Sequence, residues 1–118
     1  MKLRLLLIFL VITTIPSCIR ETDLTGVPEV TFSGDVKRVI SANCSFPDCH
    51  GIGGDEIGLN TYEEVKSQVE PGNARQSLLY RTVTGRTAEE MPPSGYPDLS
   101  TQDIRLIYIW IEQGAKNN

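Results

Sequence analysis

The chain has 118 residues, of which 40% are hydrophobic and 22% are charged, and its formal net charge at pH 7 is −4. This length allows one small domain. The 15 Asp and Glu residues outnumber the 11 Lys and Arg residues, which argues against a nucleic-acid binder because such proteins cluster basic residues.

The first residues of the chain predict a signal peptide. Lys2 and Arg4 supply positive charge ahead of the apolar run Leu5–Ile12, and Pro16 follows it. The run is too short to span a bilayer, which takes about 20 residues. We therefore expect residues 1–17 to be removed and the protein to be exported.

The end of this segment, Ile15-Pro16-Ser17-Cys18, resembles the lipobox of bacterial lipoproteins. The resemblance implies that Cys18 carries lipid and begins the mature chain, although Ile15 and Pro16 depart from the usual pattern. Residues 18–31 would then be a lipidated cysteine and a flexible tether. Such a protein is held in the bacterial cell envelope by lipid, on the periplasmic or outer surface. An ordinary signal peptide that happens to contain a cysteine is the alternative.

Residues 32–118 predict an all-α domain of about four short helices with long loops. Ser33 is the expected cap of a helix over 34–43, with Val36, Val39 and Ile40 on one face. This helix leads directly into the most informative stretch of the sequence.

That stretch is Cys44-Ser-Phe-Pro-Asp-Cys49-His50. The shorter pattern C-x-x-C-H is typical of covalent haem attachment, in which each thiol adds to one haem vinyl group and the adjacent histidine approaches the iron. Here four residues separate the cysteines, so the loop between them must bulge, and Pro47 is a candidate to shape it. Cys44 and Cys49 are the candidate haem attachment residues.

Further helices are expected after a glycine-rich loop. Thr61-Tyr-Glu-Glu64 is a capping-box pattern that opens a short helix to about Val69. A turn at 71–73 precedes a third helix over 74–83, which we expect to bury Leu78, Leu79 and Val83.

Two residues are candidate iron ligands. His50 is the only histidine in the chain, and Met91 is the only methionine that remains once Met1 is removed. Pro92 and Pro93 stiffen the loop that presents the Met91 thioether. A pair of His and Met axial ligands favours electron transfer and raises the reduction potential of haem iron. Alternatively, Met91 fills an apolar gap, as most methionines do.

The last element, around 106–111, is rich in β-branched and aromatic residues and fits either a buried strand or a helix. Its flanks favour a helix. Ser100-Thr-Gln-Asp103 is a capping signal, and Gly114 is a suitable residue just beyond the helix end.

From Phe32 to Ala115 the chain resembles a small bacterial class I c-type cytochrome domain. The likeness rests on the Cys44–Gly51 motif, on Met91-Pro92-Pro93 and on the ending Trp110-Ile-Glu-Gln-Gly-Ala115. It implies one covalent haem c held by Cys44 and Cys49. His50 would be the proximal ligand and Met91 the distal one. The first and last helices would pack together near Trp110, and Arg81 would be a candidate partner for a haem propionate, unless it is simply a solvated charge.

These features predict a monomeric one-electron carrier whose partners are a redox donor and a redox acceptor. A colourless exported binding module with a Cys44–Cys49 disulfide is the alternative. A zinc site with these cysteines and His50 is weaker, since its fourth ligand would have to be Cys18 or a carboxylate such as Asp48 or Asp55. We do not expect an enzyme, because no nucleophile lies beside a separate base. Peroxidase or ligand-sensing activity would need an open site where Met91 is expected to bind.

Overall fold

The secondary structure is entirely helical in the part of the chain that the computed structural model describes, residues 21–118. The expected signal peptide and Cys18 lie outside these residues. Residues 21–118 form four short α-helices and two short helical segments of other types, packed into a compact all-α globule. In chain order they are the π-helix η1 (Phe32–Val36), α1 (Lys37–Asn43), α2 (Tyr62–Lys66), the 3-10 helix η2 (Ala74–Gln76), α3 (Leu78–Val83) and α4 (Thr101–Glu112).

The first helical segment begins two residues earlier than the sequence predicts. Thr31, not Ser33, is the cap, and its hydroxyl oxygen accepts a hydrogen bond from the Gly34 amide. The Thr31 hydroxyl also donates to the Asp35 carboxylate, which accepts from the Thr31 amide as well. This reciprocal pairing satisfies the Thr31 amide and, of the first turn, the Gly34 amide. The expected buried face is confirmed, because Val36, Val39 and Ile40 are at most 1% exposed.

The last helix, α4, settles the ambiguous segment in favour of a helix. The Ser100 hydroxyl accepts a hydrogen bond from the Asp103 amide at 3.1 Å, as the capping signal predicts. Gly114 follows the end of the helix with φ +101°, a conformation that suits glycine. Trp110 is fully buried, and its ring centroid lies 5.7 Å from that of Phe32 in η1. Trp110 therefore packs at the contact between the first and last helical segments.

The third predicted helix is interrupted at Ser77. Ser77 has extended dihedral angles, so η2 ends before it and α3 begins after it. Its hydroxyl is fully buried, accepts from the Glu70 amide at 2.8 Å and bonds to the Asn73 carbonyl at 2.9 Å. These local bonds compete with the helical ladder. Because the break turns α3, Leu79 is buried but Leu78 is 49% exposed, so the prediction that Leu78 is buried was wrong.

The second helix opens as predicted. The Thr61 hydroxyl accepts from the Glu64 amide, and the Glu64 carboxylate accepts from the Thr61 and Asn60 amides. These hydrogen bonds, from Thr61 first, lower the pKa of the Glu64 carboxyl. The helix ends at Lys66 rather than near Val69.

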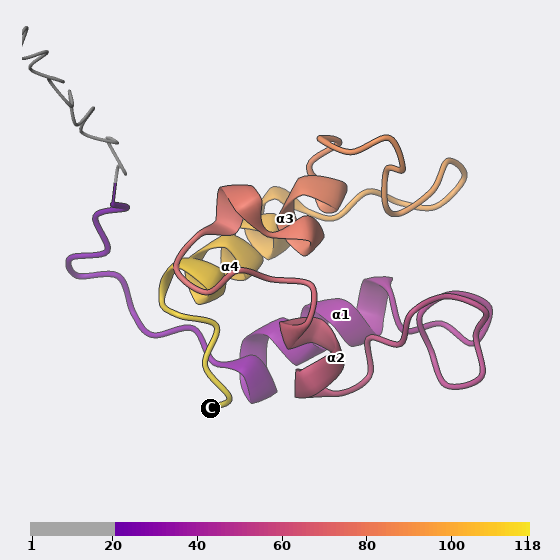
Figure 1. Cartoon of the computed structure of the whole chain (residues 1–118), viewed down its shortest axis with the longest axis horizontal. Coiled ribbons are helices and arrows are strands. Elements are labelled where there is room, and N and C mark those ends of the chain that lie inside the picture. Colours follow the sequence, from indigo (N-terminus) through magenta and orange to yellow (C-terminus); the bar gives the residue numbers. More distant parts are fainter. Residues whose placement is uncertain (1–20) are drawn as a thin grey trace, which may run out of the picture.

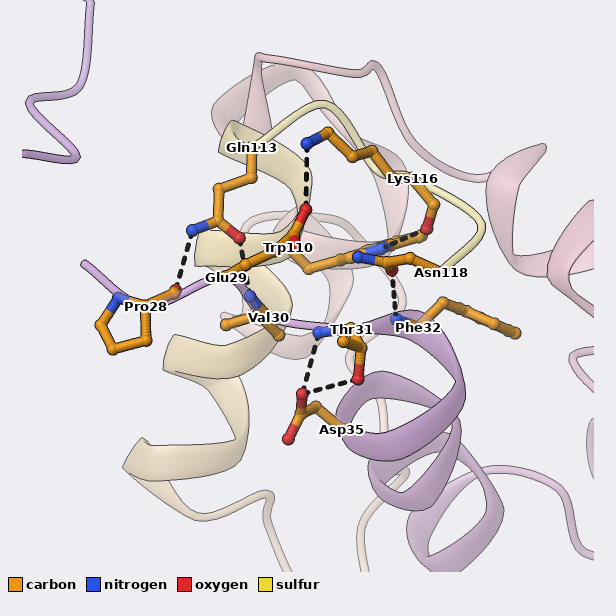
Figure 2. Close-up of polar contacts among 10 residues, drawn as sticks. All are labelled: Pro28, Glu29, Val30, Thr31, Phe32, Asp35, Trp110, Gln113, Lys116 and Asn118. Carbon is orange, nitrogen blue, oxygen red and sulfur yellow. Dashed lines mark hydrogen bonds and ion pairs between the residues drawn. The ribbon is translucent and has the colours of Figure 1, made fainter. Parts of the chain in front are cut away.

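The two ends of the described chain are joined by a group of polar contacts that we call the terminal clasp (Figure 2). The Val30 amide donates to the Gln113 side chain at 2.9 Å, and the Phe32 amide donates to the Asn118 side chain at 2.9 Å. The Trp110 indole N–H donates to the Lys116 carbonyl at 2.9 Å. The last part of the expected tether, including the buried Val30, is therefore packed against the domain.

Two long loops extend from the helices toward the same end of the molecule (Figure 1). One joins α1 to α2 over 44–61, and the other joins α3 to α4 over 84–100. In Figure 1, α1 and α4, which carry much of the buried core and include Trp110, lie to the left of these loops. None of the helices within 21–118 has the length and apolar character that crossing a membrane requires.

Candidate functional site

The loop from Cys44 to Gly51 is closed by its own backbone. The Cys49 amide donates to the Phe46 carbonyl at 2.9 Å, and the Gly51 amide donates to the same oxygen at 2.9 Å. The His50 amide reaches back to the Cys44 carbonyl at 3.2 Å. The six residues between Cys44 and Gly51 thus fold into consecutive turns. These turns accommodate the four residues between the cysteines and bring the Cys44 carbonyl to the His50 amide.

Glycine is required where this loop folds onto itself. A Cβ atom on Gly51 would lie 2.5 Å from the Phe46 carbonyl oxygen and 2.9 Å from the Ser45 carbonyl oxygen, closer than real Cβ atoms approach. A Cβ atom on Gly54 would collide with the Cys49 carbonyl oxygen. The chain on either side of His50 can pack this closely only because these residues lack a side chain.

The His50 ring is held by a main-chain acceptor. Its Nδ1 atom lies 2.8 Å from the carbonyl oxygen of Ile57. A carbonyl oxygen only accepts hydrogen bonds, so Nδ1 carries the proton and a neutral ring keeps the Nε2 lone pair free. Metal-bound histidines commonly use their second nitrogen in this way. The Leu59 amide donates to the His50 carbonyl at 3.0 Å and closes the intervening loop.

The two motif thiols are free, with no Cys44–Cys49 bond. Burial, with a smaller contribution from the neighbouring Cys49 sulfur, raises the pKa of the Cys44 thiol to about 11. Cys44 therefore stays protonated at neutral pH. Because the thiolate is the form that binds zinc and attacks disulfides, this environment disfavours both reactions at Cys44.

Met91 lies in the second long loop, half-buried, after the turn that ends α3. Its amide is 3.5 Å from the Thr82 carbonyl, a weak contact that brings the loop back to α3. Nearby, the Thr87 hydroxyl donates to the Glu89 carbonyl at 2.6 Å. The Met91–Pro92 peptide bond is cis.

A single cavity of about 580 Å³ unites these residues. Its walls include Cys44, Cys49, His50 and Met91, although Met91 is 41 residues beyond His50 in the sequence. The volume lies within the range of about 300–1,000 Å³ that is usual for ligand and cofactor sites. The rest of the wall is mainly apolar and includes side chains from both loops and α3, among them Phe46, Ile57, Leu59, Leu79, Tyr96 and Leu99.

The residues present fit a haem group. The cavity offers two free thiols, one imidazole with an available nitrogen and one thioether, on a largely apolar wall. This donor set does not fit zinc, since no three His, Cys, Asp or Glu side chains within 21–118 come close enough to hold a metal ion. Asp48 lines the cavity and Asp55 does not.

Two further residues were expected at functional positions, Arg81 and Cys18, and neither is part of the cavity wall that the structure describes. Arg81 does not line the cavity, while the following residues Thr82 and Val83 do. The candidate propionate partner is therefore not part of the cavity wall. Cys18, the expected lipidation site, lies outside the described residues.

Sequence reasoning missed two contributors. The Ile57 carbonyl that orients His50 is a main-chain group, so the residue type gave no signal. Leu99, buried just before the Ser100 cap of α4, lines the cavity although it is remote from the motif in sequence. Its apolar character before the Ser100 cap was the only available signal.

Comparisons with known proteins add no relative. No family model, no curated protein and no solved structure matches the chain. Any functional conclusion therefore rests on the residues of this cavity.

Proposed function

We propose that the protein carries one electron at a time through a single haem c bound in this cavity. Cys44 and Cys49 would hold the group by thioether bonds, formed as each S–H adds across one vinyl double bond. His50, through Nε2, and Met91, through its thioether sulfur, would bind the iron. Bound in this way, haem iron supplies reversible one-electron chemistry.

One observation carries the proposal. The folded chain brings His50 and Met91, from two separate loops, to one largely apolar cavity whose wall also holds both motif cysteines. The disulfide-stapled binding module explains the two cysteines but leaves this convergence, and the orientation of the His50 ring, without a purpose. Those contacts favour the electron carrier.

The chain's own residues have distinct parts in this function. The hydrogen bond from His50 Nδ1 to the Ile57 carbonyl would hold the ring and increase the basicity of Nε2. Leu79 and Leu99, both buried, would keep water from the cavity floor. Met91 would close the remaining axial position, which argues for a carrier over a peroxidase or a ligand sensor.

The proposal extends to location and partners. Lipid on Cys18 would anchor the protein to a bacterial envelope membrane, and a redox donor and acceptor would exchange electrons with it as a monomer. The motif residues of the cavity support the redox role, whereas the anchor rests on the lipobox resemblance alone.

The deciding experiment is an absorption spectrum of the full chain produced with a haem c maturation system. We expect a sharp reduced α-band that survives acid–acetone extraction, because the bond to haem is covalent. The weak red charge-transfer band of Met–iron ligation should appear in the oxidised form and vanish in Met91→Ala. A colourless protein with Cys44 and Cys49 joined would refute the proposal and establish the disulfide-stapled module.

A further inference from the structure

The mouth of the cavity combines exposed apolar side chains with negative charge. Phe46, Ile57, Leu78 and Tyr96 all line the cavity, yet they are 42%, 53%, 49% and 53% exposed. They come from both long loops and the start of α3. Large apolar side chains that remain exposed together mark an interaction site more often than single ones do.

The charged residues of the same cavity are all acidic. Asp48, Glu56 and Glu89 line it, and no Lys or Arg does. The loops also carry Asp55, Glu90 and Asp98. None of these six carboxylates forms an ion pair with a basic residue of the described chain.

The basic residues of the described chain that have partners do not pair with these carboxylates. Arg86 is the only basic residue of the two loops, and its guanidinium carbon lies 5.9 Å from the centre of the Tyr80 ring. Arg38 pairs with Asp103, and Lys116 pairs with Glu29 in the terminal clasp. The two loops thus carry six carboxylates and one Arg, so their net charge is negative.

We infer that this mouth is the docking surface for a redox protein with a basic face. The inference rests on the proposed function and specifies the partner of the same site. The acidic residues would attract and orient the partner over distances of about 8–10 Å at physiological salt. The exposed apolar side chains would form the dry centre of the contact. In each encounter this protein would lose one electron and the partner would gain it, so the exchange would need no other reactant.

The test compares two one-electron oxidants of opposite charge. One is ferric mitochondrial cytochrome c, whose surface is rich in lysine, and the other is the anion ferricyanide. The rate of oxidation of the reduced, haem-loaded full chain is measured from low to high salt. We expect the rate with the basic protein to fall as salt increases and the rate with ferricyanide to rise.

Charge-reversal variants locate the effect. The mouth variant is D48K/E56K/E89K, and the control is E21K/E63K/E70K, which changes the net charge equally at exposed residues that do not line the cavity. At low salt the mouth variant should react with cytochrome c at least about tenfold more slowly than the control does. With ferricyanide it should react faster than the control. Tyr96→Ser should slow cytochrome c more than ferricyanide.

The outcomes separate the two proposals. Equal rates for the mouth and control variants, with covalent haem present in both, would overturn the docking surface and leave the electron carrier standing. A wild-type protein without covalent haem would overturn the proposed function and, with it, this partner. A slower reaction of the mouth variant with both oxidants would show damage to the haem site and would also overturn the electrostatic assignment.

Discussion

Adding one methyl group at Gly51 should displace the loop that carries the haem motif. The new Cβ atom would lie 2.5 Å from the Phe46 carbonyl oxygen and 2.9 Å from the Ser45 carbonyl oxygen. Both are backbone atoms, so neither can turn aside as a flexible side chain would. Overpacking of this kind costs about 1–3 kcal/mol. Since each 1.4 kcal/mol changes an equilibrium constant by a factor of ten, the equilibrium between the native and the displaced loop shifts toward the displaced loop by a factor of about 5 to 150.

Displacing the loop should affect haem binding because Gly51 is next to the candidate iron ligand His50. The Gly51 amide donates to the same Phe46 carbonyl oxygen that accepts from Cys49, so moving Gly51 opens the turn that closes the motif. We expect Gly51→Ala to lower the affinity for haem before attachment by about 5- to 150-fold, and so to reduce the haem bound per protein. The measurement is covalent haem per protein after acid–acetone extraction, alongside unfolding of the haem-free protein in urea.

Gly53→Ala is the matched control. Gly53 has φ +81°, so an alanine there costs about 1–2 kcal/mol of backbone strain, but its Cβ atom would meet nothing within 4 Å. The two variants should therefore lose similar stability while only Gly51→Ala loses haem. If both load haem equally well, the close approach at Gly51 does not position the motif and the reasoning is refuted.

Three other changes test separate parts of the structure. Met91→Ala should lower the reduction potential and let carbon monoxide bind the reduced protein, and an unchanged potential and spectrum would remove Met91 from the site. In the haem-free protein, iodoacetamide should alkylate Cys44 more slowly than Cys49 at pH 8, as mass spectrometry can show. The rate at Cys44 should keep rising to about pH 11, where its pKa lies. The stability that the neutral thiol provides is present below its ordinary pKa of 9.0 and is lost as pH rises toward 11. Trp110→Ala should cost about 3–5 kcal/mol in urea unfolding, while Trp110→Phe, which keeps a ring but loses the bond to Lys116, should cost less.

The helices could largely be predicted because their boundaries depend on hydrogen bonds between residues that are close in sequence. The capping pairs Thr61 with Glu64 and Ser100 with Asp103 fix two helix starts through hydrogen bonds within one turn. The composition of 106–111 alone favours neither helix nor strand, and the flanking residues decided it correctly. The error at the first helix arose because Thr31 and Ser33 are both capping residues. The Asp35 carboxylate, four residues after Thr31, selects the earlier start.

The interruption of the third helix at Ser77 could not be predicted from the neighbouring residues. Serine is tolerated inside helices, and nothing in its neighbours marks an interruption. Ser77 breaks the helix because it is buried and its hydroxyl must find partners, which Glu70 and Asn73 provide from the preceding turn. Burial is a property of the assembled fold, so the sequence pattern gave no indication of it.

In the candidate site, too, some features can be read from neighbouring residues, and others depend on how the whole chain folds. Cys44, Cys49 and His50 are recognisable from spacing because neighbouring residues carry the chemistry. That Met91 lines the same cavity depends on where the α3–α4 loop folds, and the acceptor for His50 is a backbone carbonyl.

The cavity is also coupled to the core through a small set of leucines. Leu59, Leu79 and Leu99 are buried in the core and line the cavity, whereas Val36, Ile107 and Trp110 are buried without touching it. The buried contacts of Val36, Ile107 and Trp110 therefore do not involve the cavity, and most of the candidate site residues lie on the two loops. A group that fills the cavity would cover these three leucines and add to their apolar burial. Loading the site should thus stabilise the loops most and the η1–α4 contact least, because Trp110 and Phe32 already pack together there without it.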